Sequence, residues 1–195
     1  MKIHSKILAF VALASGFAGV AAAAVETYAI DPVHSSVGFS IRHVFSKVPG
    51  SFTQFHGTLV IDRSNLENSE VQAVIDVGSV TTANEKRDHH LKSPDFFDAA
   101  KFATISFTSK SWKKTGDNTY DVTGNLTIRD VTKEVVLKVT SLGFGPGMTG
   151  APVSGWEAST TLNRTDYGVD GPAMLGKAVG DEVTVSISVE ADLKK

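Results

Sequence analysis

Alternation of apolar and polar residues with a period of two runs through most of this chain and constrains its fold more than any other feature. The clearest row covers 183–189, where Val and Ile at odd positions are separated by Thr184, Ser186 and Ser188. Similar rows lie at 28–30, 36–41, 58–61, 71–76, 103–108, 120–128, 134–139 and 156–162. Because successive side chains of a strand point to opposite faces, each row predicts a half-buried strand. We therefore expect an all-β protein.

Turn-forming residues separate these rows. The segment Asp62–Asn65 ends one expected strand, and Thr115–Asn118 predicts a hairpin loop. Residues 143–155, which are rich in Gly, are expected to form a flexible loop. A helix is expected only near 84–92, with Asn84 as its N-cap, because Pro follows soon after.

The first 24 residues have the pattern of a secretory signal peptide. Lys2 and Lys6 precede an apolar stretch over 7–20, and small residues follow. Basic, apolar and small-residue regions in this order direct export and cleavage. A transmembrane anchor is the alternative, but the stretch is rich in Gly and Ala and has few large residues. We expect residues 1–24 to be cleaved, at a bond within Ala21–Val25, and residues 25–195 to form one domain in the periplasm.

Composition excludes several classes of function. The 195-residue chain has no cysteine, which excludes disulfides, thiolate zinc sites and a cysteine nucleophile. Its 19 Lys and Arg residues against 21 Asp and Glu residues argue against a nucleic acid partner. The phosphate-binding pattern G-x-x-x-x-G-K-[ST] does not occur, and the spacing G-x-G-x-x-G occurs only at 145–150, within the Gly-rich stretch expected to be a loop and not between a strand and a helix. We therefore expect no cofactor.

Catalytic and metal-binding patterns are also missing from the sequence. Five histidines follow the expected signal peptide: His34, His43, His56, His89 and His90. None has H-x-x-x-H or H-E-x-x-H spacing, and adjacent side chains diverge on strands and helices alike. No G-x-S-x-G nucleophile elbow occurs. We expect neither a metal site nor catalysis. An enzyme acting on a lipid-like substrate, through a His, Arg and Asp cluster, is the alternative.

Many evenly spaced strands predict either a sandwich or a barrel. An eight-stranded barrel holds its own side chains or one small ligand. Small residues recur on the expected strand faces, namely Gly38, Ala73, Ala103, Gly124 and Ala158. They leave room for a ligand if they face inward, and are ordinary surface residues if they face outward. Both arrangements stay open at this point.

Four segments spread over the chain resemble the YceI-like family, also called the polyisoprenoid-binding or lipid-binding YceI family. They are 28–43 (YAIDPVHSSVGFSIRH), 87–98 (RDHHLKSPDFFD) with Lys101 and Phe102, 124–133 (GNLTIRDVTK), and 163–169 (NRTDYGV) with 179–183 (VGDEV). The chain departs from the family pattern at Ala103, Asp130 and Glu134, where Pro, Gly and Pro are common. These departures change local turn and strand chemistry only.

The resemblance implies a lipocalin-like antiparallel β-barrel of about eight strands with a short helical insertion near residues 84–92. It implies an exported binding or transport protein that holds a long apolar ligand: a polyprenyl chain, a quinone or a fatty-acid derivative. It supplies no catalytic residues. A homodimer that covers two barrel mouths and an unidentified membrane partner are further hypotheses.

Each CH₂ group of a lipid tail that leaves water contributes about 0.8 kcal/mol, so an apolar cavity supplies affinity and a few polar groups supply specificity. For the head group of the ligand we expect His34, Arg42, His43, Arg87, Asp88 and His90. For the cavity wall we expect Phe39, Ile41, Phe52, Phe55, Ile105, Phe107 and Leu126. The alternative for Arg87 and Asp88 is a structural ion pair that pins the helix to the barrel.

Overall fold

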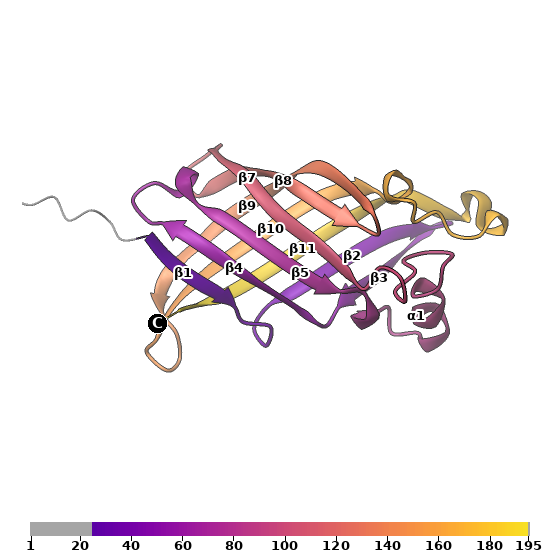
Figure 1. Cartoon of the computed structure of the whole chain (residues 1–195), viewed down its shortest axis with the longest axis horizontal. Coiled ribbons are helices and arrows are strands. Elements are labelled where there is room, and N and C mark those ends of the chain that lie inside the picture. The colour runs from indigo at the N-terminus through magenta and orange to yellow at the C-terminus, as the bar shows by residue number, and fades with distance from the viewer. Residues whose placement is uncertain (1–24, 195) are drawn as a thin grey trace, which may run out of the picture.

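The computed structural model describes residues 25–194 (Figure 1), so the expected signal peptide lies outside the described residues. Within them the chain forms eleven strands, one α-helix and four 3₁₀ helices. The elements are β1 (Val25–Ile30), β2 (Ser36–His43), β3 (Ser46–Phe52), β4 (Phe55–Asp62), η1 (Leu66–Asn68), β5 (Glu70–Asp76), η2 (Val77–Ser79), β6 (Val80–Thr81), α1 (Glu85–Leu91), β7 (Thr104–Lys114), β8 (Thr119–Ile128), β9 (Val131–Pro146), β10 (Pro152–Asn163), η3 (Arg164–Tyr167), η4 (Ala173–Ala178) and β11 (Val179–Leu193).

Eight of these strands close into an antiparallel barrel in the order β1-β4-β5-β7-β8-β9-β10-β11. Closure involves only the C-terminal part of β11, where Leu193 pairs with Tyr28 and Ala191 with Ile30 of β1. The N-terminal part of β11 pairs with β2, which continues the sheet into β3 and β6. The expected all-β barrel with a short helical insertion is therefore confirmed, with three strands added beside it.

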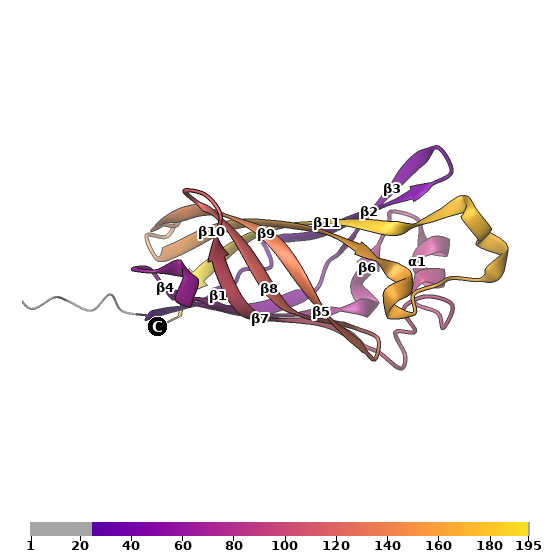
Figure 2. The same ribbon diagram turned by 90° about the horizontal axis from the view of Figure 1, so that it is seen from above.

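The two ends of the barrel differ in structure (Figure 2). One end, which carries the C-terminus and is called the packed end here, contains a buried cluster in which the Trp112 and Trp156 rings meet edge to face at 5.6 Å. Tyr28, Ile61 and Val122 complete its centre and are almost fully buried. The other end, called the mouth here, is surrounded by the β2–β3 turn, α1 and the segment 164–178 (Figure 2).

The helix begins where the sequence predicts. The Asn84 side chain accepts a hydrogen bond from the backbone N–H of Arg87 at 3.0 Å, so Asn84 is the N-cap of α1. The helix ends at Leu91, with Lys92 as its C-cap. No helix within residues 25–194 is both long and apolar enough to cross a membrane.

The expectation of a flexible loop over 143–155 is wrong. Strand β9 continues to Pro146 and β10 begins at Pro152, and these two prolines are paired in the register. Gly143 has a φ of +124°, which glycine adopts without a steric penalty, so the strand passes through this position. The glycines therefore permit two long, bent strands and a short turn between them.

Candidate ligand-binding cavity

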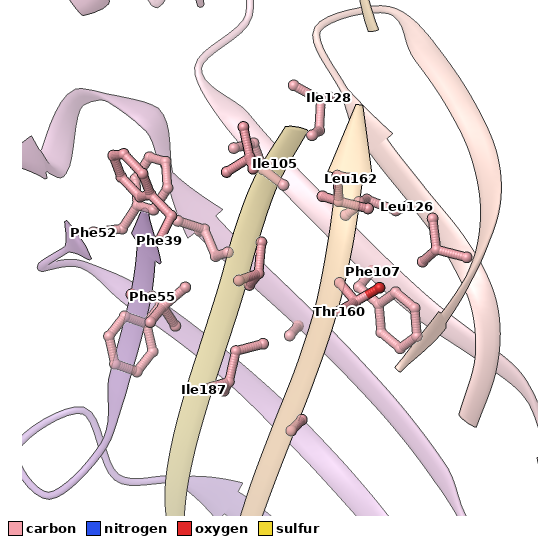
Figure 3. Close-up of a pocket in the computed structure, with 18 of the residues that line it drawn as sticks. Phe39, Phe52, Phe55, Ile105, Phe107, Leu126, Ile128, Thr160, Leu162 and Ile187 are labelled. Carbon is pink, nitrogen blue, oxygen red and sulfur yellow. The ribbon is translucent and has the colours of Figure 1, made fainter. Parts of the chain in front are cut away.

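A cavity of about 450 Å³ occupies the interior of the barrel. This volume lies within the range of roughly 300–1,000 Å³ that is usual for small-molecule sites. The cavity is long, since the residues of β11 that line it run from Val179 to Val189. Ten residues of strand correspond to about 30 Å. Figure 3 shows that aromatic and aliphatic side chains from several strands point into this space.

The structure places all seven side chains expected for the wall on this cavity. They are Phe39 and Ile41 of β2, Phe52 of β3, Phe55 of β4, Ile105 and Phe107 of β7, and Leu126 of β8. Three of the rings form a chain along one side, with Phe52 at 5.7 Å from Phe39 and 5.9 Å from Phe97. These aromatic contacts fix the wall next to α1 without filling the barrel.

A large part of the wall was not expected from the sequence. It comes from β9, β10 and β11 and from the packed end: Trp112, Val122, Val135, Leu137, Val139, Trp156, Ala158, Thr160, Leu162, Val183, Val185, Ile187 and Val189. The signal for these residues was present, because the row at 183–189 alternates as strictly as any in the chain. What the sequence did not indicate was which face of each strand turns inward.

The small residues divide between the two faces. Ala73 and Ala158 line the cavity, so they do leave room inside. Gly38 also lines the cavity, but only through its backbone, because an added Cβ atom would point outward and lie 3.2 Å from the hydroxyl of the exposed Ser186. Ala103 is exposed and precedes β7.

Three of the six residues expected at the head group line the cavity, namely His43, Arg87 and His90. Arg42 does not, because Ile41 and His43 on either side of it face inward. The exposed side chain of Arg42 therefore lies on the outer face of β2, and its predicted contact with a ligand head group stays a prediction.

His34 lies outside the cavity, in the turn between β1 and β2. Its Nδ1 atom is 2.6 Å from the Asp31 carboxylate, and this hydrogen bond raises the pKa of His34 and lowers that of Asp31. Asp31, His34 and Glu190 offer potential ligand atoms that all lie within 4.8 Å of one another. This group is separate from the residues that line the barrel.

Asp88 holds the helix to the strand before it. Its carboxylate accepts hydrogen bonds from the backbone N–H of Thr82 at 2.7 Å, the Thr82 hydroxyl at 2.5 Å and the Thr81 hydroxyl at 3.1 Å. Burial raises the pKa of Asp88, but these hydrogen bonds and the nearby Arg87 charge outweigh burial, so its pKa is lower than usual. The carboxylate is therefore bound to Thr81 and Thr82, and Asp88 is not among the residues that line the cavity.

Arg87 is fixed by the same threonine. Its Nε donates to the Thr82 hydroxyl at 2.7 Å and its Nη2 to the Thr82 carbonyl at 3.0 Å. Arg87 and Asp88 thus both bind Thr82, and the alternative of an ion pair between them is replaced by a shared partner. Within the described residues Nη1 of Arg87 has no hydrogen bond, so it is free to bind a ligand at the mouth.

Two other polar groups of the wall are already paired. His90 Nε2 lies 2.7 Å from the Asp95 carboxylate, and its ring packs edge to face on Phe96. Arg164, whose side chain is only 9% exposed, donates to the carbonyls of Val169, Asp170 and Gly180 and pairs with Asp181 at 2.9 Å. The guanidinium of Arg164 therefore holds the rim together.

Comparison with known proteins agrees with this geometry. A sequence model of the family described as "YceI-like domain" matches residues 28–191. A relative from Pseudomonas syringae pv. tomato, named only "UPF0312 protein", is 35% identical over 92% of this chain and 95% of its own length.

Solved structures with the same fold include BcnA of Burkholderia cenocepacia, with a TM-score of 0.76 and 23% identity, over 83% of this chain and 98% of that one. A domain from Saccharophagus degradans, titled a polyisoprenoid binding domain implicated in plant cell wall breakdown, has a TM-score of 0.66 and 16% identity. It matches over 88% of this chain and 100% of its own. At these identities the two structures establish the fold.

Proposed function

Because this chain belongs to the family of YceI-like domains, we propose that it is an exported carrier of one amphiphilic lipid. The apolar tail, an isoprenoid, quinone or fatty-acyl chain, lies in the barrel and the head group lies at the mouth. The protein binds this lipid without chemical change.

The observation that carries the proposal is the distribution of polar groups on the cavity wall. Along the strands the wall consists mostly of aliphatic and aromatic side chains, with His56 of β4 and Thr160 of β10 as polar exceptions, whereas His43, Arg87 and His90 lie at the mouth. A tail in such a cavity contributes about 0.8 kcal/mol for each CH₂ group that leaves water. The length of about 30 Å exceeds the roughly 15 Å of one bilayer leaflet, so a membrane lipid tail fits along it.

The mouth favours a polar or anionic head group. Arg87 retains a free Nη1 donor, and the imidazole of His43 is exposed on the same rim. A guanidinium binds phosphate and carboxylate oxygens with charge-assisted hydrogen bonds. The description of the Saccharophagus degradans domain as polyisoprenoid-binding supports an isoprenoid as the tail.

The arrangement does not favour the alternative enzyme. In the described residues His90 pairs with Asp95, as a catalytic base pairs with its orienting group. The nearby Ser93 hydroxyl, however, accepts a hydrogen bond from the Asp95 backbone and has none with His90. Asp88 is bound to threonines and His34 lies outside the cavity. These side chains therefore do not form the nucleophile and base pair that the alternative needs.

Native mass spectrometry tests the proposal. The full chain is expressed in a Gram-negative host, recovered from the periplasmic fraction and purified without detergent. We expect cleavage of the leader within Ala21–Val25 and one additional lipid mass per chain, released by organic extraction. A ligand-free mass, with no uptake of added polyprenyl, quinone or fatty-acyl lipids, would falsify the carrier function.

A further inference from the structure

Three apolar side chains protrude from the rim of the mouth. Phe45 is 98% exposed and Val44 is 47% exposed, and together they form the two-residue turn between β2 and β3. Met174, in η4, is 89% exposed. The Val44 backbone N–H donates to the carbonyl of Ala178 at 2.8 Å, which ties the turn to the η4 segment. We call Val44, Phe45 and Met174 the mouth tip.

The backbone of this turn is unfavourable for the residue it contains. Val44 has a φ of +52°, and two-residue hairpin turns that need a positive φ at their first position usually have Gly, Asn or Asp there. A β-branched residue in this region is a genuine outlier. The turn gains almost no burial from Phe45 and only partial burial from Val44 in return, and strained positions of this kind cluster at functional sites.

A basic pair lies directly behind the mouth tip. Arg42 and Lys47 are cross-strand partners on β2 and β3, and both are exposed on the outer face of the sheet. Like charges directly opposite each other destabilise a sheet. Among residues 25–194 neither forms an ion pair, and the acidic Asp181 on β11 is already paired with Arg164. Their charges are therefore available to an external anion.

We propose that the mouth tip docks on the surface of an anionic lipid bilayer. The side chains of Val44, Phe45 and Met174 enter the boundary between head groups and acyl chains, and Arg42 and Lys47 contact the anionic head groups. Exposed apolar side chains backed by basic residues are the combination that binds protein segments to such surfaces. Docking brings the open end of the cavity to the bilayer, so a lipid passes between them without crossing water.

The packed end supplies an internal control. Met148 is fully exposed in the turn between β9 and β10, and this turn lies at the far end from the mouth (Figure 1).

A second copy of the chain is the other occupant that the mouth tip could contact, because a two-fold dimer would cover both tips. The experiment below separates these cases.

The test is flotation of the purified protein with vesicles of phosphatidylethanolamine and phosphatidylglycerol, and with vesicles of phosphatidylcholine alone. We expect binding to the first kind, lowered at least about tenfold by the double variant F45S/M174S and unchanged by M148S. The variant R42E/K47E removes the preference for the anionic vesicles. Circular dichroism of each variant establishes that it is folded.

Three results would overturn the docking proposal. The first is no binding of the native protein to either kind of vesicle. The second is equal loss of binding in M148S and F45S/M174S. The third is a dimer, measured by sedimentation velocity, that F45S/M174S dissociates, because the mouth tip would then be an interface between copies.

Two uptake experiments distinguish failure of docking from failure of the carrier function. Uptake of a fluorescent fatty-acyl lipid supplied on cyclodextrin reports on the cavity alone, whereas uptake from vesicles requires docking as well. We expect F45S/M174S to keep the first and lose the second. Absence of uptake from cyclodextrin in the native protein contradicts the carrier function, and equal uptake from vesicles by both proteins contradicts docking.

Discussion

The ring of Phe107 on β7 lies over Gly124 on the neighbouring strand β8. A Cβ atom added at Gly124 would come within 2.5 Å of the Phe107 Cζ atom and 2.6 Å of the Thr108 carbonyl oxygen. The ring can rotate away, but the carbonyl belongs to the sheet and cannot. The missing side chain of Gly124 therefore sets the position of one aromatic group of the cavity wall.

Replacement of Gly124 by Ala tests this relationship. We expect a loss of about 1–3 kcal/mol in the free energy of unfolding, because the site is overpacked, and weaker lipid uptake, because the displaced Phe107 ring enters the cavity. Urea denaturation and a lipid-binding titration measure the two effects. Gly145→Ala is the matched control, since no atom lies within 4 Å of the added Cβ. Equal behaviour of the two variants contradicts the interpretation.

A larger side chain inside the cavity should weaken lipid binding more than it changes the stability of the fold. Ala158 faces the cavity, whereas its neighbour Ser159 is exposed on the other face of β10. Because the barrel holds empty space, we expect Ala158→Phe to weaken lipid binding about tenfold, or ~1.4 kcal/mol, with a smaller change in unfolding free energy. Ser159→Phe should leave lipid binding unchanged. Titration with the extracted ligand compares them, and equal affinities show that the tail lies elsewhere.

The elements that the sequence predicts well are those fixed by local interactions. The Asn84 cap, the turn at Thr115–Asn118 and the alternating rows each depend on residues close in the chain. Strand β3, with Pro49 and Gly50, has no such pattern and was not expected. It forms through contact with its partner strand β2. The Phe39 ring of β2 leaves no room for a side chain at Gly50, because an added Cβ atom would lie 2.3 Å from that ring.

The candidate site was predictable where the alternation of side chains holds. The same rule that places Ile41 on the wall places Arg42 outside, so the outward position of Arg42 was predictable. The inward position of Trp112 was not predictable. A bulge between Ser109 and Ser111 shifts the register of β7, so that Phe107 and Trp112 both face inward despite their odd and even numbers.

Shortening a side chain should lower the unfolding free energy more at the packed end than on the cavity wall. Ile61 is fully buried within the cluster of the packed end, whereas Leu162 lines the empty cavity. In lipid-free protein we expect Ile61→Ala to lower the unfolding free energy by about 2–5 kcal/mol, and Leu162→Ala to lower it by less. Leu162 already lacks neighbours on one side, so its removal breaks fewer contacts. Urea denaturation of both variants measures the difference, and the reverse order would contradict this account.

The hydrogen bonds of Asp88 should determine how rigidly residues 82–92 are held at the mouth. Asp88→Ala leaves the buried backbone N–H of Thr82 without its partner, which costs about 1–3 kcal/mol. We expect faster amide hydrogen exchange over 82–92 and little change in β8 and β9. Asp88→Asn keeps one acceptor oxygen and should have a smaller effect. Hydrogen exchange with mass spectrometry checks this, and uniform acceleration throughout the barrel would show that Asp88 supports the whole fold.

Asp62 should make the stability of the protein fall in acid. Hydrogen bonds from the Asn68 amide and the Ser64 hydroxyl lower the pKa of Asp62 to about 2. The unfolded chain, with an ordinary pKa near ~3.9, binds a proton first as the pH falls. The contribution of Asp62 is therefore complete above about pH 4 and disappears as the pH approaches 2.

Comparison of Asp62→Asn with the native protein tests the direction of this pH dependence of stability. We expect the difference in urea midpoint to be largest near neutral pH and to shrink steadily as the pH falls from about 4 to 2, because the native carboxyl becomes neutral there too. Ser64→Ala removes one donor, so it should give the same trend with a smaller amplitude. A difference that stays constant between these pH values, or an NMR titration of the Asp62 carboxyl at its usual pKa, contradicts the assignment.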